Sequence, residues 1–472
     1  MLLKVFKNEW RLMAREKTLW FAALLLLAFA IYAIQNGINW QSQRQTTIAN
    51  YVLEAEKALD EQRAAVEEQE QNPDANNGRP AGGQPNRASY EATLPPGPLS
   101  ALTIGQSDLY PFRASVSPFR RQDNLFRNYQ IDSPLGLLAG KFDFTFVIVY
   151  LLPLLIIALG YNLLSGEKES GVLALALSQP LSASKLVFGK VLARLALLTG
   201  LVIVVGILGG MFGVAGSDVA LPLDRLVFWL AIIGVYATFW FALTALVAAF
   251  GRKSEMNLTV LMSAWLLFLL VVPALLNISI NQISPVPSRM EYVSKMRAAE
   301  NDAQRKSSEL LAEFYHEHPE LAAGEQRRDF VSTFYAVQQD VESSVLPVAQ
   351  EYERRLMDQQ ALIGTFRLLS PAVVVQEALN DIAGSSVARQ QSYVRQLREY
   401  LLEWRSFLAP KIFRSERLAS RDYEALPRFE FQEEETSVIS ARVMPGAAGL
   451  LVLTGVLLFW ATAKLKRFRL VS

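Results

Sequence analysis

The chain alternates between long apolar stretches and two long polar segments. Six stretches approach the roughly 20 apolar residues that a helix needs to cross a bilayer core about 30 Å thick. They lie at residues 18–35, 144–164, 191–212, 226–250, 258–276 and 446–463. Because an isolated segment in lipid must satisfy its own backbone hydrogen bonds, each stretch is predicted to be a transmembrane helix. The first stretch lies where a signal peptide would, but no small-residue cleavage site follows it before Trp40, so we expect it to stay uncleaved.

The two long polar segments, residues 36–143 and 277–445, are predicted to be mainly helical insertions. A helix rich in Glu, Gln and Ala is expected at 41–69, followed by a linker rich in Pro, Gly and Asn. The second segment has one apolar stripe at helical spacing, formed by Phe330, Phe334, Val337, Val341 and Val345. Another helix is predicted at 391–407 and a short extended piece at 423–431. The predicted fold class is therefore an all-α integral membrane protein with six transmembrane helices.

Basic residues gather beside the predicted spans. Arg252 and Lys253 lie between spans four and five. The other basic flanks precede the first span or follow the last one: Lys4, Lys7, Arg11, Arg15, Lys17, Lys464, Lys466, Arg467 and Arg469. Because Lys and Arg favour the cytoplasmic side of a membrane, residues 1–17, the loop 165–190 and the tail 464–472 are predicted to be cytoplasmic. The two long segments are then extracytoplasmic.

Composition narrows the chemistry. Hydrophobic residues make up 51% of the chain, which is above the usual share for a soluble protein. The net charge is only +1 and the topology already accounts for the basic residues, so no nucleic-acid partner is expected. Cysteine is absent, which excludes disulfides, thiol catalysis and Cys-bound metal. The two histidines, His316 and His318, are two residues apart and point to different sides of a helix, so no metal site is predicted.

No motif supports an enzyme. The segment nearest to a phosphate-binding P-loop is GLLAGKF at 136–142, which is one residue short and ends in Phe instead of Ser or Thr. Two pairs have the Ser-x-x-Lys spacing of some acyl enzymes, but helix caps and interfacial charges explain them better: Ser165 with Lys168, and Ser182 with Lys185. We therefore expect no catalytic residues and no cofactor on this chain.

Some residues within the spans interrupt their apolar, helical character. Pro153 and Gly160 in span two and Pro273 in span five are predicted kink points, because each perturbs the helical hydrogen-bond ladder. The alternative is that Pro and Gly are simply frequent in membrane helices. Arg194 is the clearest buried-charge candidate, but it is expected near the cytoplasmic end of span three, where it can snorkel.

The polar cassette SGEKESGVLALALSQPLSASKLVFGK, residues 165–190, separates spans two and three. Gly171 follows its acidic turn, and Leu173 with Leu177 then forms an apolar pair four residues apart on a short helix. The residues expected to stop this helix are Gln179 and Pro180. Such a helix could press its leucines into a groove on a cytoplasmic protein, while Glu167 and Glu169 find basic partners at the rim. It could equally rest on lipid headgroups.

Two segments give this chain a specific resemblance. MLLKVFKNEWRLMAREK before span one and SGEKESGVLALALSQPLSASKLVFGKVLAR between spans two and three are similar to the permease subunit of ABC-2 type ABC transporters. The branch with a large uncharacterised outer insert is the most similar, through PPGPLSALTIGQSDLYPF at 95–112, LLSPAVVVQEALNDIAG at 368–384 and LPRFEF at 426–431. The resemblance covers nearly the whole chain.

The resemblance implies partners that the chain itself does not encode. A dimer of cytoplasmic ATPase subunits would bind ATP and Mg and dock on the cassette, which would act as the coupling helix. Two permeases, identical or paralogous, would complete the complex in a bacterial inner membrane. Residues 1–17 would form an amphipathic helix at the inner surface, and 251–257, with Arg252, Lys253 and Glu255, a second ATPase contact.

Three functions are left open. The complex could move a substrate through or along the permease dimer. It could instead use ATP to drive the outer segments mechanically against a periplasmic or envelope partner, which their size favours. A membrane-anchored binding protein without an ATPase is the third.

Overall fold

The computed structural model describes residues 2–72, 82–126, 141–178, 182–215, 220–285, 288–305 and 330–467. The chain is mostly helical, and within these residues six helices are long and apolar enough to cross a membrane. They span Leu19–Gln71, Phe144–Glu169, Ala183–Val214, Leu223–Ala249, Ser254–Ile283 and Thr436–Lys466. Each of the six coincides with one of the six predicted apolar stretches, of which the first and the fourth extend one residue beyond the helix, so that prediction is confirmed at the level of helix and composition.

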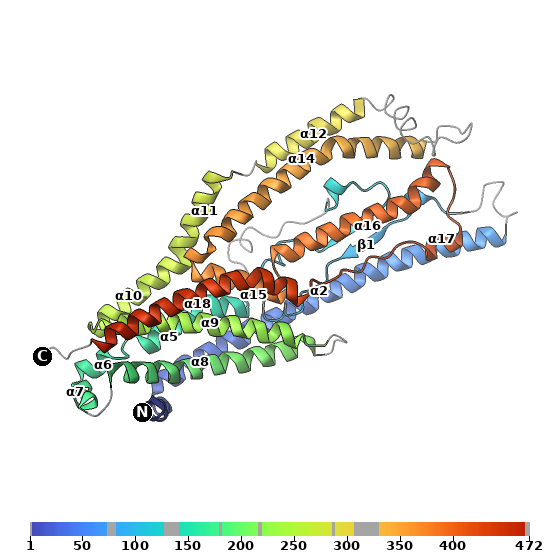
Figure 1. Cartoon of the computed structure of the whole chain (residues 1–472). Helices are drawn as coiled ribbons and strands as arrows, with labels where there is room; N and C mark the ends of the chain where they lie inside the picture. The colour runs from blue at the N-terminus through green and yellow to red at the C-terminus, as the bar shows by residue number, and fades with distance from the viewer. Residues whose placement is uncertain are drawn as a thin grey trace.

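These helices form one bundle, whose members are α2 (Lys17–Gln71), α4 to α5 (Phe144–Gly160), α8 (Ala183–Val214), α9 (Leu223–Ala249), α10 to α11 (Ser254–Ile283) and α18 (Thr436–Lys466). Helix α9 lies at its centre and packs against α5, α8 and α18. Its large aromatic side chains Trp229, Tyr236 and Trp240 are fully buried. Figure 1 shows both chain termini at one end of the bundle, beside α6 (Ser165–Glu169) and α7 (Val172–Leu177). At the same end α1 (Leu2–Met13) packs on α8.

Helix α2 continues far beyond the bundle. Its 55 residues extend for about 80 Å at 1.5 Å per residue. The predicted span 18–35 and the predicted helix 41–69 are therefore parts of one unbroken helix, which leads from the bundle into the outer part of the molecule (Figure 1).

The outer part has its own hydrophobic core. Strands β1 (Tyr90–Thr93) and β2 (Arg113–Val116) pair antiparallel, with Tyr90 opposite Val116. They pack with α16 (Val387–Phe413) around the buried side chains of Tyr393, Leu397 and Trp404. The prediction of an all-α protein was wrong in this detail, because the two strands are too short to show an alternating pattern. Short helices complete this part: η2 (Pro85–Arg87), η3 (Gln122–Asn124) and α17 (Ser420–Glu424).

A helical hairpin, α12 (Arg289–Arg305) and α14 (Phe330–Phe366), projects beyond α11 (Figure 1). Of the predicted apolar stripe, Val341 and Val345 are fully buried against α12, whereas Phe334 is 42% exposed. The turn η7 (Arg367–Leu369) and α15 (Pro371–Ala383) lead back to the bundle, where α15 packs on α9 and α18. The predicted helix 391–407 lies within the longer α16. The predicted extended piece 423–431 begins in α17 and continues without joining a sheet.

Candidate functional site

The cassette folds into two short helices at the end of the bundle that carries both termini (Figure 1). Gly171 separates α6 from α7 with a φ of +75°. A Cβ at this position would meet no atom within 4 Å, so the backbone conformation, rather than crowding, requires glycine here. This left-handed residue turns α7 away from the direction of α6 and decides which of its side chains face outward.

The outward face of α7 differs from the prediction. Leu173, predicted to contact a partner, is 1% exposed and belongs to the bundle core. The large apolar side chains of α7 that face solvent are Val172, 50% exposed, and Leu175, 73% exposed. The side chain of Leu177 lies outside the described residues. Sequence spacing identified an apolar pair but could not tell which side of α7 packs against the bundle.

The two acidic residues of the cassette bond within the chain. The Oε1 of Glu167 lies 2.6 Å from the Nζ of Lys190 on α8, and Lys190 also donates to the Leu163 carbonyl. Glu169 accepts from the backbone N–H and the Oγ of Ser254, the first residue of α10, at 2.7 and 3.0 Å. These carboxylates fasten the cassette to two different helices of the bundle. The prediction that these carboxylates meet basic residues of a partner at a rim stays a prediction; within this chain Glu167 pairs with Lys190 and Glu169 accepts from Ser254.

The turn before α10 lies directly beside the cassette. Lys168 donates to the carbonyl of Gly251 at 3.1 Å, and Ser254 Oγ donates to Ser165 Oγ at 2.9 Å. The predicted second contact, with Arg252, Lys253 and Glu255, therefore lies beside α6 of the cassette. All three of these side chains are exposed. The other two predicted residues, Gln179 and Pro180, lie outside the described residues.

The first helix is also joined to this end of the bundle. The Nη2 of Arg194 on α8 lies 3.0 Å from the Oε1 of Glu9 on α1, and both side chains are buried. A second nitrogen of Arg194 donates to the Leu159 carbonyl of α5. Arg194 is thus buried, as its choice as the buried-charge candidate predicted, but it forms an ion pair and does not snorkel. Glu9 was missed by the sequence reasoning, although it is the one acidic residue before Glu16 in a basic segment.

Both predicted proline kinks follow a π-helical turn. The turn η4 (Val147–Leu151) precedes Pro153, and η5 (Leu267–Val271) precedes Pro273. Proline has no N–H to donate to a carbonyl of the preceding turn. Side chains from other elements donate hydrogen bonds to carbonyls of these turns instead. The bonds are Tyr236 OH to Val149 O at 2.9 Å, Trp265 Nε1 to Tyr150 O at 3.2 Å, and Ser370 Oγ to Phe268 O at 2.6 Å. Because π-helical turns often mark functional sites, these two are the candidate hinges of the bundle.

Gly160 has a different position from the two prolines. It is the last residue of α5, and a Cβ there would lie 2.5 Å from Cγ2 of Thr244 on α9. Its role in the structure is close packing between two helices where α5 ends.

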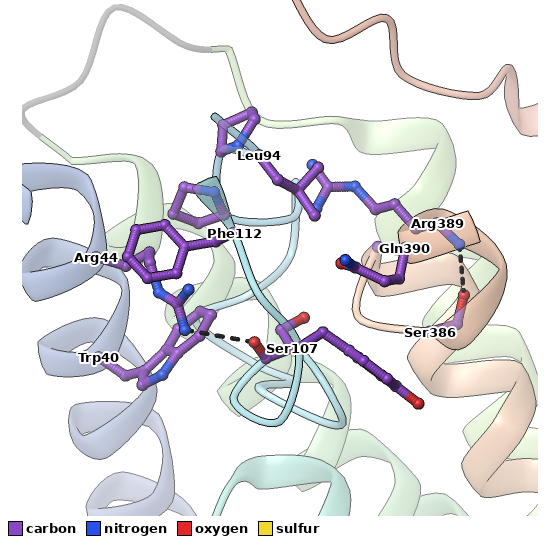
Figure 2. A pocket seen from close by; sticks show the side chains of 12 residues that line it. Trp40, Arg44, Leu94, Ser107, Phe112, Ser386, Arg389 and Gln390 are labelled. Atoms are coloured by element: carbon purple, nitrogen blue, oxygen red, sulfur yellow. Dashed lines mark hydrogen bonds between the residues drawn. The ribbon is translucent and has the colours of Figure 1, made fainter. Parts of the chain in front are cut away.

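The opposite end of the bundle is joined to the outer part by what we call the outer joint: the loop 95–112 with Trp40, Arg44, Asp143 and Gln390. Figure 2 shows Arg44 beside the rings of Trp40 and Phe112, with its guanidinium bonded to Ser107 O at 3.3 Å. Gln390 on α16 donates to Pro111 O at 3.0 Å. The cavity among these residues is about 20 Å³, room for about one water. The outer joint is therefore a closed connection between elements.

Asp143 fastens the same loop to the start of α4. Its carboxylate accepts from the backbone N–H groups of Ile104, Gly105 and Phe146 at 3.0, 3.1 and 2.8 Å. Burial raises the pKa of Asp143 to about 6, against the lowering effect of the three N–H donors. The loop position and the first turn of a bundle helix thus depend on one carboxyl group.

Comparison with known families adds one finding. A family model described as a domain of unknown function (DUF3526) matches residues 289–432, which run from α12 to just before α18. No curated protein matches the chain. The matched segment contains the helical hairpin, α15 and α16, and does not include the cassette. Among the residues that the structure describes, no group of three or more His, Asp or Glu could hold a metal ion; His316 and His318 lie outside them.

Proposed function

We propose that this chain is the permease subunit of an ATP-driven ABC transporter in a bacterial inner membrane. The six apolar helices cross the membrane, with both termini and the cassette in the cytoplasm. A dimer of separate ATPase subunits binds ATP and Mg and docks on the cassette. ATP hydrolysis there drives a substrate across the membrane.

The observation that carries this proposal is the way in which the cassette helices α6 and α7 are attached to the bundle. It exposes Val172 and Leu175, while Leu173 is buried in the bundle and the carboxylates of α6 bond to α8 and α10. A helix that only rests on lipid headgroups needs no such bonds. A helix that passes a partner's motion to the bundle must be fixed to the parts that it moves.

A second permease fits along α10 to α11. In the most apolar segment of this helix only 11% of the residues are buried in the molecule, against 56% in the corresponding segment of α9. Its 30 residues extend for about 45 Å, beyond a bilayer core of about 30 Å. The exposed apolar side chains of this helix reach its last residue, Ile283, which is 65% exposed. Because a bilayer core does not cover the whole length of the helix, a second copy or a paralogue is the proposed partner.

The outer joint favours a second candidate function. Asp143, at the start of α4, accepts from Ile104 of the loop 95–112, and Gln390 of α16 donates to Pro111 of the same loop. Arg389 of α16 forms an ion pair with Glu433, in the segment that leads into α18. Arg225, buried at the start of α9, donates to the Glu434 carbonyl beside it. Movement of the bundle would therefore be transmitted to the outer part. In this function, ATP drives the outer part against an envelope partner and nothing crosses the membrane.

The test of ATPase docking uses the exposed residues of α7. The full chain is purified from bacterial membranes with an affinity tag, and ATP hydrolysis by the eluate is measured. Leu175→Asp is expected to reduce the captured ATPase activity at least about tenfold, because it places a charge at the centre of an apolar contact. Leu53→Asp is the matched control, since Leu53 is 50% exposed on the outer half of α2. Equal activity for wild type and Leu175→Asp would overturn the docking site.

Reconstituted vesicles separate the two functions. ATP-dependent accumulation of a candidate peptide or lipid supports transport. ATP turnover that rises only when an envelope protein is added, with no accumulation, supports the mechanical function.

A further inference from the structure

A groove opens on the flank of the bundle, between α18 and the turn that leads from η7 into α15. One wall is formed by Leu368, Pro371 and Val374, and the other by side chains of α18 that include Leu453 and Val456. The cavity is about 260 Å³ and every residue that lines it is apolar. It is thus large enough for a segment of hydrocarbon chain and offers no polar side chain to a soluble ligand.

Both walls of the groove carry exposed side chains. Val456, on the wall formed by α18, is 47% exposed, and Leu368, on the opposite wall, is 48% exposed. The turn above it is held at the level of η5, because Ser370 donates to the Phe268 carbonyl in the middle of the α10 to α11 helix. Glycine permits this close approach: a Cβ at Gly449 would lie 2.5 Å from Cδ2 of Leu368. If α10 to α11 crosses the bilayer, the groove opens to acyl chains.

Charged groups lie one helical turn beyond the groove, toward the outer part. The guanidinium carbon of Arg367 is 3.6 Å from the Cβ position of Gly446, three residues before Gly449 on α18. Arg367 reaches Glu377 Oε2 at 3.4 Å and the Arg442 carbonyl at 3.5 Å. Both distances are at the long limit of hydrogen bonding. The rim therefore has a guanidinium and a carboxylate that are held only weakly by their present partners.

We infer that the groove binds an acyl chain of a phospholipid with an ammonium headgroup, its phosphate on Arg367 and its ammonium on Glu377. Carboxylates outnumber guanidinium groups at the rim, where Arg442 bonds to Asp381 and Glu434. An anionic headgroup would add a further negative charge there, whereas a zwitterionic headgroup meets both signs. This inference rests on the proposed membrane placement of the six helices and is independent of ATPase docking.

Native mass spectrometry of the full chain in detergent micelles tests the inference. Phosphatidylethanolamine and phosphatidylglycerol with the same acyl chains are added separately, and the bound lipids are counted. The wild type should retain one phosphatidylethanolamine at detergent concentrations that remove phosphatidylglycerol. Leu453→Trp should reduce the retained fraction about tenfold, because it fills the groove and removes the burial of several methylenes. Val204→Trp is the control, since Val204 is 54% exposed on α8, away from the groove.

The headgroup contacts are tested by Arg367→Gln and Glu377→Gln. Arg367→Gln should weaken retention of both lipids, and Glu377→Gln should abolish the preference for phosphatidylethanolamine. Equal retention of lipid by Leu453→Trp and the wild type, or equal retention of the two lipids by the wild type, overturns the inference. Release of the chain from membranes by alkaline carbonate would show that the six helices do not cross the membrane. Loss of ATPase capture alone would contradict only the docking site and would leave the lipid inference standing.

Discussion

Arg194 and Glu9 form a buried ion pair, 3.0 Å between Nη2 and Oε1, that joins the first helix of the chain to α8. Because Arg194 also donates to the Leu159 carbonyl, the pair connects α1, α5 and α8. The helix α1 is thereby fixed to the same end of the bundle as the cassette. Any motion of α8 would be shared by α1.

Substituting one member of this pair should lower the unfolding free energy more than substituting both members. Arg194→Met or Glu9→Gln alone is expected to cost roughly 3–5 kcal/mol of unfolding free energy, because one charge or strong donor stays buried without its partner. The double variant should recover part of that loss. Thermal unfolding in detergent measures all three. A double variant whose loss equals the sum of the two single losses would show that the residues are not coupled.

Glu169 should hold the first turn of α10 in place. Glu169→Gln replaces the charged acceptor of the Ser254 N–H and hydroxyl, and a bond of this kind contributes about 1.5–3 kcal/mol. We expect hydrogen exchange in residues 254–257 to rise at least about tenfold, since local opening then costs less. Glu54→Gln, an exposed position on α2, is the control. Unchanged exchange at 254–257 would mean that the cassette is not fastened through this carboxylate.

The six bundle helices could be predicted because each depends on a local property, a run of apolar residues of sufficient length. The residues that bond to the carboxylates of the cassette could not be predicted. Glu167 meets Lys190, 23 residues later, and Glu169 meets Ser254, 85 residues later. Nothing in the spacing of charges shows that such residues come together in space.

The orientation of α7 was missed for a related reason. An apolar pair four residues apart identifies one face of a helix, but the left-handed Gly171 decides how that face is turned. Its φ of +75° points Leu173 into the bundle and leaves Val172 and Leu175 outside. The run VLALAL has apolar residues all round, so either face was a candidate.

The hinge at Pro153 makes a prediction about paired substitutions. Tyr236→Phe removes the donor to the buried Val149 carbonyl and should cost about 1–3 kcal/mol. Pro153→Ala restores a backbone N–H four residues after Val149, where a regular helix would bond to that carbonyl. The double variant should therefore be more stable than Tyr236→Phe alone, by thermal unfolding in detergent. Tyr32→Phe, 64% exposed, is the control. If Pro153→Ala gives no recovery, the missing N–H is not what Tyr236 replaces.

Asp143 makes a prediction about pH. Its pKa is raised from 3.8 to about 6 in the folded chain, so the folded state holds the proton more tightly than the unfolded state. Its contribution to stability is full below about pH 4 and is lost as pH rises through 6, by about 3 kcal/mol in total. Asp143→Asn cannot titrate, so between pH 4 and 7 the wild type should lose stability relative to the variant. An opposite trend would show that the three N–H donors outweigh burial at this carboxyl.

The orientation of the chain can be tested directly, because it has no cysteine. Ser178 follows α7 and Ser288 precedes α12, and both are exposed. Figure 1 places α7 at the end of the bundle that carries the termini and α12 beyond the far end of α11. With the cassette in the cytoplasm, a membrane-impermeant maleimide should label Ser288→Cys in spheroplasts and should label Ser178→Cys only after permeabilisation. Labelling of Ser178→Cys but not of Ser288→Cys in intact spheroplasts would reverse the orientation. The cassette would then face away from cytoplasmic ATP, and no ATPase could dock on Val172 and Leu175.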